Sequence, residues 1–202
     1  MLKLDPFYPI VPDATFAKRL VPQGVKFLQL RIKEASQETI ETDIAETIRL
    51  CAEHDCVLVI NDYWREAIAF GADFIHLGQE DLADADLNAI KQAGLKLGVS
   101  THSLDELDTA LAAEPDYVAL GPVYETKLKK MAWDPQGLPR LSEWRAKIGI
   151  PLVAIGGITC ETVAGVLEAG ADSAAVVTDI IRAEDPEART REWIEATAPW
   201  RI

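Results

Sequence analysis

Two basic residues stand two positions apart near the end of an apolar run. The run FLQLRI occupies positions 27–32, and Arg31 and Lys33 alternate along it with Gln29. Side chains two positions apart on a strand point to the same side, so the sequence predicts an inward row of polar groups. The alternative is a structural ion pair with Glu34 or a neighbouring acid. Because two cations on one face require a counter-charge, we favour a site for an anion.

Two carboxylates follow the next two apolar runs. Asp62 comes directly after CVLVIN at 56–61, and Asp81 follows FIHLG at 74–78 after two polar residues. If these runs form neighbouring strands, both side chains can reach one hard cation such as Mg²⁺. Taken alone, Asp62 would be better explained as the cap of the helix that begins near YWREAIAF. The second carboxylate favours a metal site.

Two further segments could meet a phosphate group. In AIGGIT, Gly156 and Gly157 would let backbone N–H groups approach an anion at the start of a following helix, although a plain tight turn needs the same residues. The segment ETKLKK, which starts at position 125, puts three lysines into four positions of a chain with a formal net charge of -13. An anionic ligand would need such a local cluster of positive charge.

The histidines and cysteines are less decisive. His76 fits a core position with satisfied hydrogen bonds, whereas His102 lies where a ligand could touch it. Neither has the Ser or Cys partner pattern of a nucleophilic site. Cys51, His54 and Cys56 are close enough to suggest metal ligands, but the two cysteines are better interpreted as core residues.

These residues belong to a chain in which short apolar runs alternate with helical patterns. Strands are predicted at 7–12, 27–32, 56–61, 74–78, 95–100, 117–124, 151–157 and 173–178, and helices at 37–53, 104–113, 141–148, 161–169 and 187–196. Near-continuous apolar strands indicate a parallel sheet covered on both faces. We therefore predict an α/β fold, a (β/α)₈ TIM barrel, as a single domain over residues 1–202. An open doubly wound sheet would alternate similarly, but the number of strands favours the barrel. Its polar strand ends would converge on one rim.

Composition excludes several classes of partner. The acidic net charge would repel a nucleic-acid backbone, and no basic stripe is present. The first residues are interrupted by Asp5, Pro6, Pro9 and Pro12, so they form no signal or membrane segment. We expect a cytoplasmic protein that binds neither nucleic acid nor membrane, and the sequence leaves open whether it is a homo-oligomer.

Six segments together resemble the thiamine phosphate synthase family. They are QLRIKE, INDYWREAIAFGADFIHLGQEDL, LGVSTHS, YVALGPVYETKLKK, PLVAIGGIT and AAVVTDI, and the resemblance spans nearly the whole chain in order and spacing. It implies a (β/α)₈ barrel that joins two small phosphorylated substrates, hydroxymethylpyrimidine diphosphate and thiazole phosphate, and releases diphosphate with Mg²⁺.

The resemblance also implies a role for particular residues. The diphosphate would be bound by Arg31, Lys33, Asn61 and Lys129; the magnesium ion by Asp62 and Asp81; the pyrimidine by Gln29 and Ser100; and the thiazole phosphate by Thr126, Gly157, Val177 and Thr178.

Two alternatives stay open beside the synthase. The segment Thr126-Lys127-Leu128-Lys129 replaces the usual Thr-x-Thr-Lys, and Asp179 follows Thr178 where the family has a small residue. A thiazole tautomerase of the same fold would need neither magnesium nor diphosphate-binding groups, and a noncatalytic phosphate-binding barrel would need no turnover. The presence of the diphosphate-binding and magnesium-binding residues favours the synthase.

Overall fold

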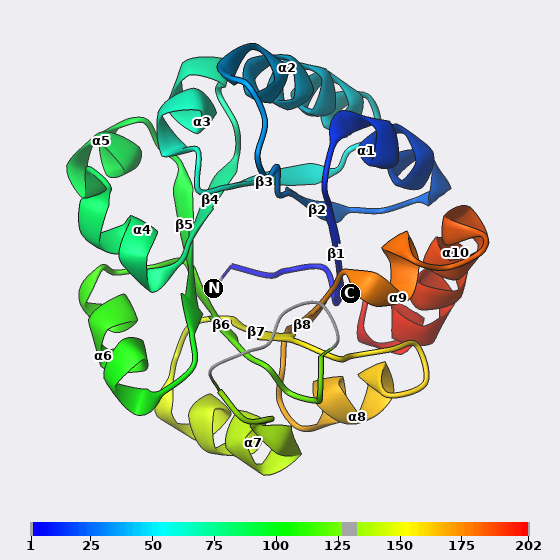
Figure 1. Ribbon diagram of the computed structural model, residues 1–202. Helices are drawn as coiled ribbons and strands as arrows, with labels where there is room; N and C mark the ends of the chain where they lie inside the picture. The colour runs from blue at the N-terminus through cyan, green and yellow to red at the C-terminus, as the bar shows by residue number, and fades with distance from the viewer. Residues whose placement is uncertain (1, 127–132, 202) are drawn as a thin grey trace.

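Eight parallel strands pair in chain order and close into a barrel when β8 pairs with β1 (Figure 1). The computed structural model describes residues 2–126 and 133–201, so Lys127, Leu128, Lys129 and Lys130 lie outside the described residues. The strands are β1 (Phe7–Val11), β2 (Phe27–Leu30), β3 (Val57–Asn61), β4 (Phe74–Leu77), β5 (Lys96–Thr101), β6 (Tyr117–Leu120), β7 (Leu152–Ile155) and β8 (Ser173–Val176). Each overlaps one predicted run, and the predicted barrel is confirmed over the open sheet.

Helices surround the barrel as an outer ring (Figure 1). They are α1 (Ala14–Leu20), α2 (Gln37–Glu53), α3 (Trp64–Phe70), α4 (Gln79–Asp84), α5 (Leu87–Gln92), α6 (Leu104–Ala112), α7 (Gly137–Lys147), α8 (Val163–Glu168), α9 (Thr178–Ile181) and α10 (Pro186–Thr197), with 3₁₀ turns at Val21–Gln23 and Ala198–Trp200. None of the helices built from the described residues combines the length and the apolar character needed to cross a bilayer.

Local sequence explains where several helices begin. Ser36 and Ser103 accept hydrogen bonds from the backbone N–H groups of Thr39 and Glu106, which caps α2 and α6. Helix α7 begins at Gly137, four residues before the predicted start. Its first turn contains Pro139. Proline breaks a helix in its interior, but it is tolerated in the first turn because the first N–H groups of a helix have no partner within it.

The barrel interior holds its own apolar cluster, separate from the larger core between strands and helices. It contains Tyr8, Ile10, Phe27, Val59, Phe74, Tyr117, Ala119, Val153 and Ala175. Centroids of the contacting aromatic rings lie between 4.2 and 6.3 Å apart. Leu2 and Leu4 pack against this cluster, and the N-terminal segment crosses the centre of the barrel view in Figure 1. Since this segment precedes β1, it covers the end where the strands begin and leaves the opposite rim for a ligand.

A substitution at Gly98 tests how tightly the barrel interior is packed. A Cβ atom at position 98 would overlap the ring of Tyr117, so we expect Gly98→Ala to lower the free energy of unfolding by about 1–3 kcal/mol through overpacking. Gly149→Ala is the control, because a Cβ there would meet nothing within 4 Å, and it should change stability by less than about 0.5 kcal/mol. Urea unfolding of both variants measures the difference. Equal stabilities would show that the ring can move without cost.

Candidate active site

Asp62 and Asp81 meet at the rim formed by the carboxyl ends of the strands. Asp62 follows β3, and Asp81 lies in the first turn of α4, directly after β4. The two carboxyl groups interact directly: burial raises the pKa of Asp62 above its ordinary value, and the negative charge of Asp81 raises it further. A carboxylate pair that repels itself in this way is suited to a cation.

The donor set of this acid pair fits magnesium better than a metal held in an all-protein cage. Within residues 2–126 and 133–201, no group of three or more His, Cys, Asp or Glu side chains could hold a metal ion. Magnesium commonly takes one or two carboxylates and completes its shell with water and substrate phosphates. Cys51 and Cys56 are buried, in agreement with their interpretation as core residues.

The backbone at Asp62 explains why an aspartate is tolerated at this turn. Its φ angle is 66°, in the left-handed region that Asp and Asn enter more readily than most residues. Its N–H group donates to the His76 carbonyl at 3.0 Å, which ties the turn to β4. The N-cap of α3 is Tyr63, without a side-chain capping bond, so the alternative that Asp62 caps this helix is wrong.

Arg31 and Lys33 lie beside the acid pair, past the end of the strand that carries Gln29, and their place on one inward face with Gln29 stays a prediction. Strand β2 ends at Leu30, and both cations lie past its end and are exposed, whereas Gln29 is 2% exposed inside the barrel. The Lys33 ammonium is 3.8 Å from the Asp62 carboxylate, and the positive charges of Lys33 and Arg31 oppose the rise in its pKa. The two cations therefore act on the acid pair. Of the alternative ion pairs, the described residues show none with Glu34, whereas Lys33 does pair with a neighbouring acid, Asp62.

A buried chain of hydrogen bonds crosses the barrel beneath this rim. Gln29 Nε2 donates to the Tyr8 hydroxyl at 2.8 Å, and the Tyr8 and Tyr117 hydroxyls are 2.9 Å apart. The Tyr117 hydroxyl is 2.8 Å from His76 Nδ1, and His76 Nε2 is 2.7 Å from Ser100 Oγ. The interpretation of His76 as a satisfied core histidine is confirmed. Sequence reasoning missed Tyr8 and Tyr117, because tyrosines within apolar runs look like ordinary packing residues.

The Ser100–His76 contact is not the dyad of a nucleophilic enzyme. Burial, together with the positive charge of Arg31, lowers the pKa of His76 to about 4. Its second ring nitrogen faces the Tyr117 hydroxyl, where a nucleophilic triad would place a carboxylate. A weak base of this kind would not activate a serine, so Ser100 is better suited to binding than to attack.

Asn61 ends β3 beside this chain. Its backbone is in register with His76 of β4, and its side chain is 5% exposed. An amide so close to the rim can reach a ligand only from within the barrel mouth.

Gly156 and Gly157 hold the loop after β7 against the loop after β6. Both have positive φ angles, 101° and 67°, which favour glycine. A Cβ atom on Gly156 would lie 2.6 Å from Pro122 Cα, and one on Gly157 would overlap the Glu125 carbonyl. Helix α8 begins only at Val163, so the prediction that the glycines stand at a helix N-terminus is wrong.

Backbone hydrogen bonds join the loop after β6 to the loop after β7 and join its own two ends. The Tyr124 N–H donates to the Gly156 carbonyl, and the Gln136 N–H donates to the Pro122 carbonyl at 2.7 Å. Thr126 is half-buried where this loop leaves the described residues. The loops after β6 and β7 therefore meet on the β6–β8 side of the rim.

Val177 and Thr178 stand at the start of the short helix α9, directly after β8. Barrels often bind phosphate at such a helix together with the loops after strands seven and eight. Asp179 faces away from the rim, because it accepts hydrogen bonds from Trp193 Nε1 at 2.7 Å and Arg189 Nε at 2.9 Å on α10. Its acidic charge is therefore used to attach α10, which explains its presence beside Thr178.

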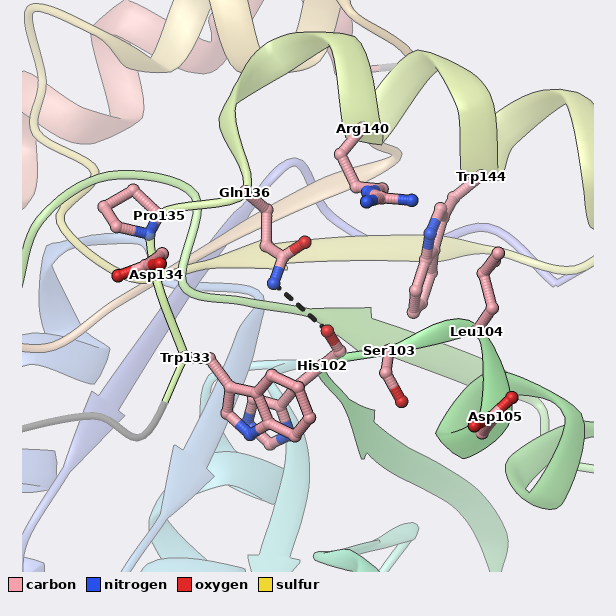
Figure 2. A pocket seen from close by; sticks show the side chains of 10 residues that line it. All are labelled: His102, Ser103, Leu104, Asp105, Trp133, Asp134, Pro135, Gln136, Arg140 and Trp144. Carbon is pink, nitrogen blue, oxygen red and sulfur yellow. Dashed lines mark hydrogen bonds between the residues drawn. The ribbon is translucent and has the colours of Figure 1, made fainter.

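A cavity of about 530 Å³ lies to the side of this rim, between the starts of α6 and α7 (Figure 2). His102 stacks on Trp133 with ring centroids 5.9 Å apart, and the His102 carbonyl accepts a hydrogen bond from Gln136. His102 Nδ1 is 2.8 Å from Glu106 Oε2, which holds the His102 ring in place. Through its stacking on Trp133, the ring in turn positions the end of the loop after β6. Apart from His102, which the sequence placed where a ligand could touch it, the described lining residues include none that the sequence assigned to substrate or metal: Ser103, Leu104, Asp105, Trp133, Asp134, Pro135, Gln136, Arg140 and Trp144.

Known proteins resemble this chain along nearly its full length. A family model described as thiamine monophosphate synthase matches residues 8–180. The thiamine-phosphate synthase of Rhizobium etli is 63% identical over 201 residues, 99% of this chain and 98% of that protein. The thiamine-phosphate synthase of Citrobacter koseri is 49% identical over 192 residues, 95% of this chain and 88% of that protein. The structure of thiamine phosphate pyrophosphorylase from Pyrococcus furiosus superimposes with a TM-score of 0.86 at 28% identity, covering 97% of this chain and 96% of that one.

The charge of Asp62 should destabilise the metal-free protein. Its raised pKa means that the native state holds the proton to a higher pH than the unfolded chain does. Stability is therefore lost as the pH rises from the ordinary aspartate pKa through the raised value. We expect Asp62→Asn, which tolerates the same φ angle, to melt at a higher temperature than the wild type near neutral pH without divalent ions.

Asp108→Asn, which removes an exposed carboxylate from α6, is the control and should leave the melting temperature unchanged. Thermal melts of the three proteins in a chelating buffer decide the point. A lower melting temperature for Asp62→Asn would mean that its ion pair with Lys33 outweighs burial and repulsion.

Proposed function

The chain belongs to the thiamine monophosphate synthase family, and we propose that it joins hydroxymethylpyrimidine diphosphate to thiazole phosphate. It is a transferase of thiamine biosynthesis. The products are thiamine phosphate and diphosphate. The observation that carries the proposal is the cluster of Asp62, Asp81, Lys33 and Arg31 at the rim, since two carboxylates can hold a metal ion and two cations can contact a departing diphosphate.

The reaction needs positioning and charge stabilisation rather than a protein nucleophile. The bond between the pyrimidine methylene carbon and the diphosphate oxygen breaks, and the thiazole nitrogen forms a new bond to that carbon. The electron pair of the broken bond leaves with diphosphate. The weakly basic His76 and the binding role of Ser100 agree with such a mechanism, because neither has to gain or lose a proton.

The acid pair would hold the magnesium ion. Asp62 and Asp81 would supply two carboxylates, and magnesium commonly completes its shell with water and substrate phosphates. When bound, the ion neutralises negative charge on the diphosphate. Lys33 and Arg31 are exposed beside this pair, so their side chains are free to turn toward the same oxygens.

Asn61 and Lys129 complete the proposed diphosphate site. The buried Asn61 amide would donate from within the barrel mouth, where a hydrogen bond is stronger than in bulk water. Lys129 lies outside the described residues, and its role stays a prediction from the family resemblance.

The thiazole phosphate would bind on the opposite side of the rim. The meeting of the loops after β6 and β7 at Gly157, and the start of α9 at Thr178, support this placement. Thr126 and Val177 flank these two places. The pyrimidine would then lie between the two phosphate sites, against Gln29 and Ser100 at the ends of the buried hydrogen-bond chain.

The tautomerase and the noncatalytic barrel are distinguished by activity. A tautomerase has no use for the acid pair and its two cations, whereas the synthase uses both. Incubation with the two substrates, with and without Mg²⁺, should give thiamine phosphate only with the metal. Conversion of the thiazole substrate alone would favour the tautomerase, and binding without turnover would favour the noncatalytic barrel.

The first test of the metal assignment is Asp81→Asn. Loss of one carboxylate should raise the Mg²⁺ concentration for half-maximal turnover by at least about tenfold, which corresponds to about 1.4 kcal/mol of metal binding. Asp84→Asn is the matched control, because Asp84 is an exposed carboxylate on the same helix. Magnesium titrations of turnover compare the two variants. An unchanged magnesium requirement in Asp81→Asn would refute its assignment as a metal ligand.

A second test concerns Gly157. Any side chain there must displace the Glu125 carbonyl, so Gly157→Ala should raise the KM for thiazole phosphate by about tenfold or more and change the KM for the pyrimidine substrate little. Gly165→Ala is the control, since a Cβ there would make an ordinary contact 3.6 Å from Leu138. Initial rates at varied concentrations of each substrate separate the two constants. An equal rise in both constants for Gly157→Ala would point to a general disturbance of the rim.

A further inference from the structure

The buried hydrogen-bond chain has a direction, and that direction reaches the substrate site. We propose that Tyr117 and His76 fix the Ser100 hydroxyl as a hydrogen-bond donor toward an acceptor nitrogen of the pyrimidine ring. His76 and Tyr117 are then positioning residues that act through Ser100. The inference rests on the proposed function for the identity of the ligand, whereas the direction of the chain rests on its own geometry.

Counting hydrogens gives the direction. Gln29 Nε2 donates to the Tyr8 oxygen, so the single Tyr8 hydroxyl hydrogen remains for Tyr117, 2.9 Å away. The Tyr117 hydrogen then goes to His76 Nδ1, its second neighbour, at 2.8 Å. An Nδ1 atom that accepts a hydrogen bond leaves the ring hydrogen on Nε2. His76 therefore donates from Nε2 to Ser100 Oγ at 2.7 Å.

The reverse direction leaves a buried hydrogen without an acceptor. If His76 carried its hydrogen on Nδ1, the Tyr117 oxygen would accept it, and the Tyr117 hydrogen would have to point to Tyr8. With the Gln29 amide nitrogen toward Tyr8, the Tyr8 hydrogen would then have no acceptor among the described residues, at a position where Tyr8 is 1% exposed. An unsatisfied buried hydroxyl is costly. A doubly protonated His76 would create the same conflict, since both of its nitrogens would donate.

The Ser100 hydroxyl therefore has its acceptor role occupied and its donor role free. Its oxygen accepts from His76, so its own hydrogen is available to a ligand. Ser100 is half-buried near the end of β5, and its backbone carbonyl accepts a hydrogen bond from Gln79 at 2.7 Å, which holds this part of the rim in place. A heterocycle with a lone pair facing Ser100 is favoured, whereas one with an N–H group at that position meets a second donor.

The direct test is the tautomer of His76. Protein labelled with ¹⁵N in histidine, without ligand and near neutral pH, is examined by long-range ¹H–¹⁵N correlation NMR. The His76→Gln variant, which lacks this ring, identifies its signals. We expect one neutral tautomer with the hydrogen on Nε2. A neutral ring with the hydrogen on Nδ1, a mixture of tautomers or a doubly protonated ring would each overturn the proposal.

Two matched variants connect the tautomer to the substrate, because each removes one buried hydroxyl. Tyr117→Phe removes the donor to Nδ1, so the spectrum should show mixed tautomers and the KM for the pyrimidine diphosphate should rise by about tenfold, with the KM for thiazole phosphate unchanged. In Tyr8→Phe the Tyr117 hydroxyl can still donate to His76, so the Nε2–H tautomer should persist. The proposal is wrong if Tyr117→Phe keeps the wild-type tautomer and pyrimidine KM, or if both variants shift the tautomer alike.

Failure of the proposed function would look different. A wild-type protein that forms no thiamine phosphate but shows the Nε2–H tautomer would refute the reaction and leave the direction of the hydrogen-bond chain standing. If Tyr117→Phe does not fold, the wild-type spectrum still decides that direction.

Discussion

Every polar side chain inside a barrel of eight strands has to find its partner within the barrel. The interior of such a barrel is just wide enough for side chains, so little room is left for water to satisfy stray donors and acceptors. Here Tyr8, Tyr117 and His76 satisfy one another, and the chain ends in Gln29 and Ser100 toward the rim. The same residues form the upper boundary of the aromatic cluster that fills the barrel. Packing below and ligand recognition above therefore depend on one set of hydrogen bonds.

The rim follows the opposite rule, because it brings two carboxylates together although burial and repulsion oppose their ionisation. Asp62 is held near Asp81 in a left-handed turn, where burial and repulsion both oppose its ionisation. A rim built only for stability would not pair two carboxylates at a loop end. Ionisable groups with shifted pKa values gather at functional sites for this reason. In the interior the buried polar side chains satisfy one another's hydrogen bonds. At the rim two carboxylates repel each other, and a bound cation would relieve that repulsion.

The sequence predicted the features that depend on order along the chain. Alternating apolar runs identified the strands, and the carboxylates after two consecutive runs identified the acid pair, since neighbours in sequence are neighbours in the barrel. It failed where contacts depend on register over several strands. The contact of Tyr117 with His76 joins β6 to β4 over Gly98 of β5, whose lack of a side chain leaves room for the tyrosine ring. Such contacts between non-adjacent strands are set by strand tilt and stagger, which no local pattern records.

Charge at the rim also couples the binding of the metal to the binding of the diphosphate. Asp62 and Asp81 together offset the positive charge of Arg31 and Lys33, so the described part of the rim holds little net attraction for a diphosphate while the carboxylates are ionised and bare. Neutralising the carboxylates releases the two cations to act on an anion. Metal and diphosphate binding should then strengthen each other, and by thermodynamic linkage the effect is equal in both directions. An acidic chain can in this way bind a highly charged anion at a site whose attraction depends on the metal being present.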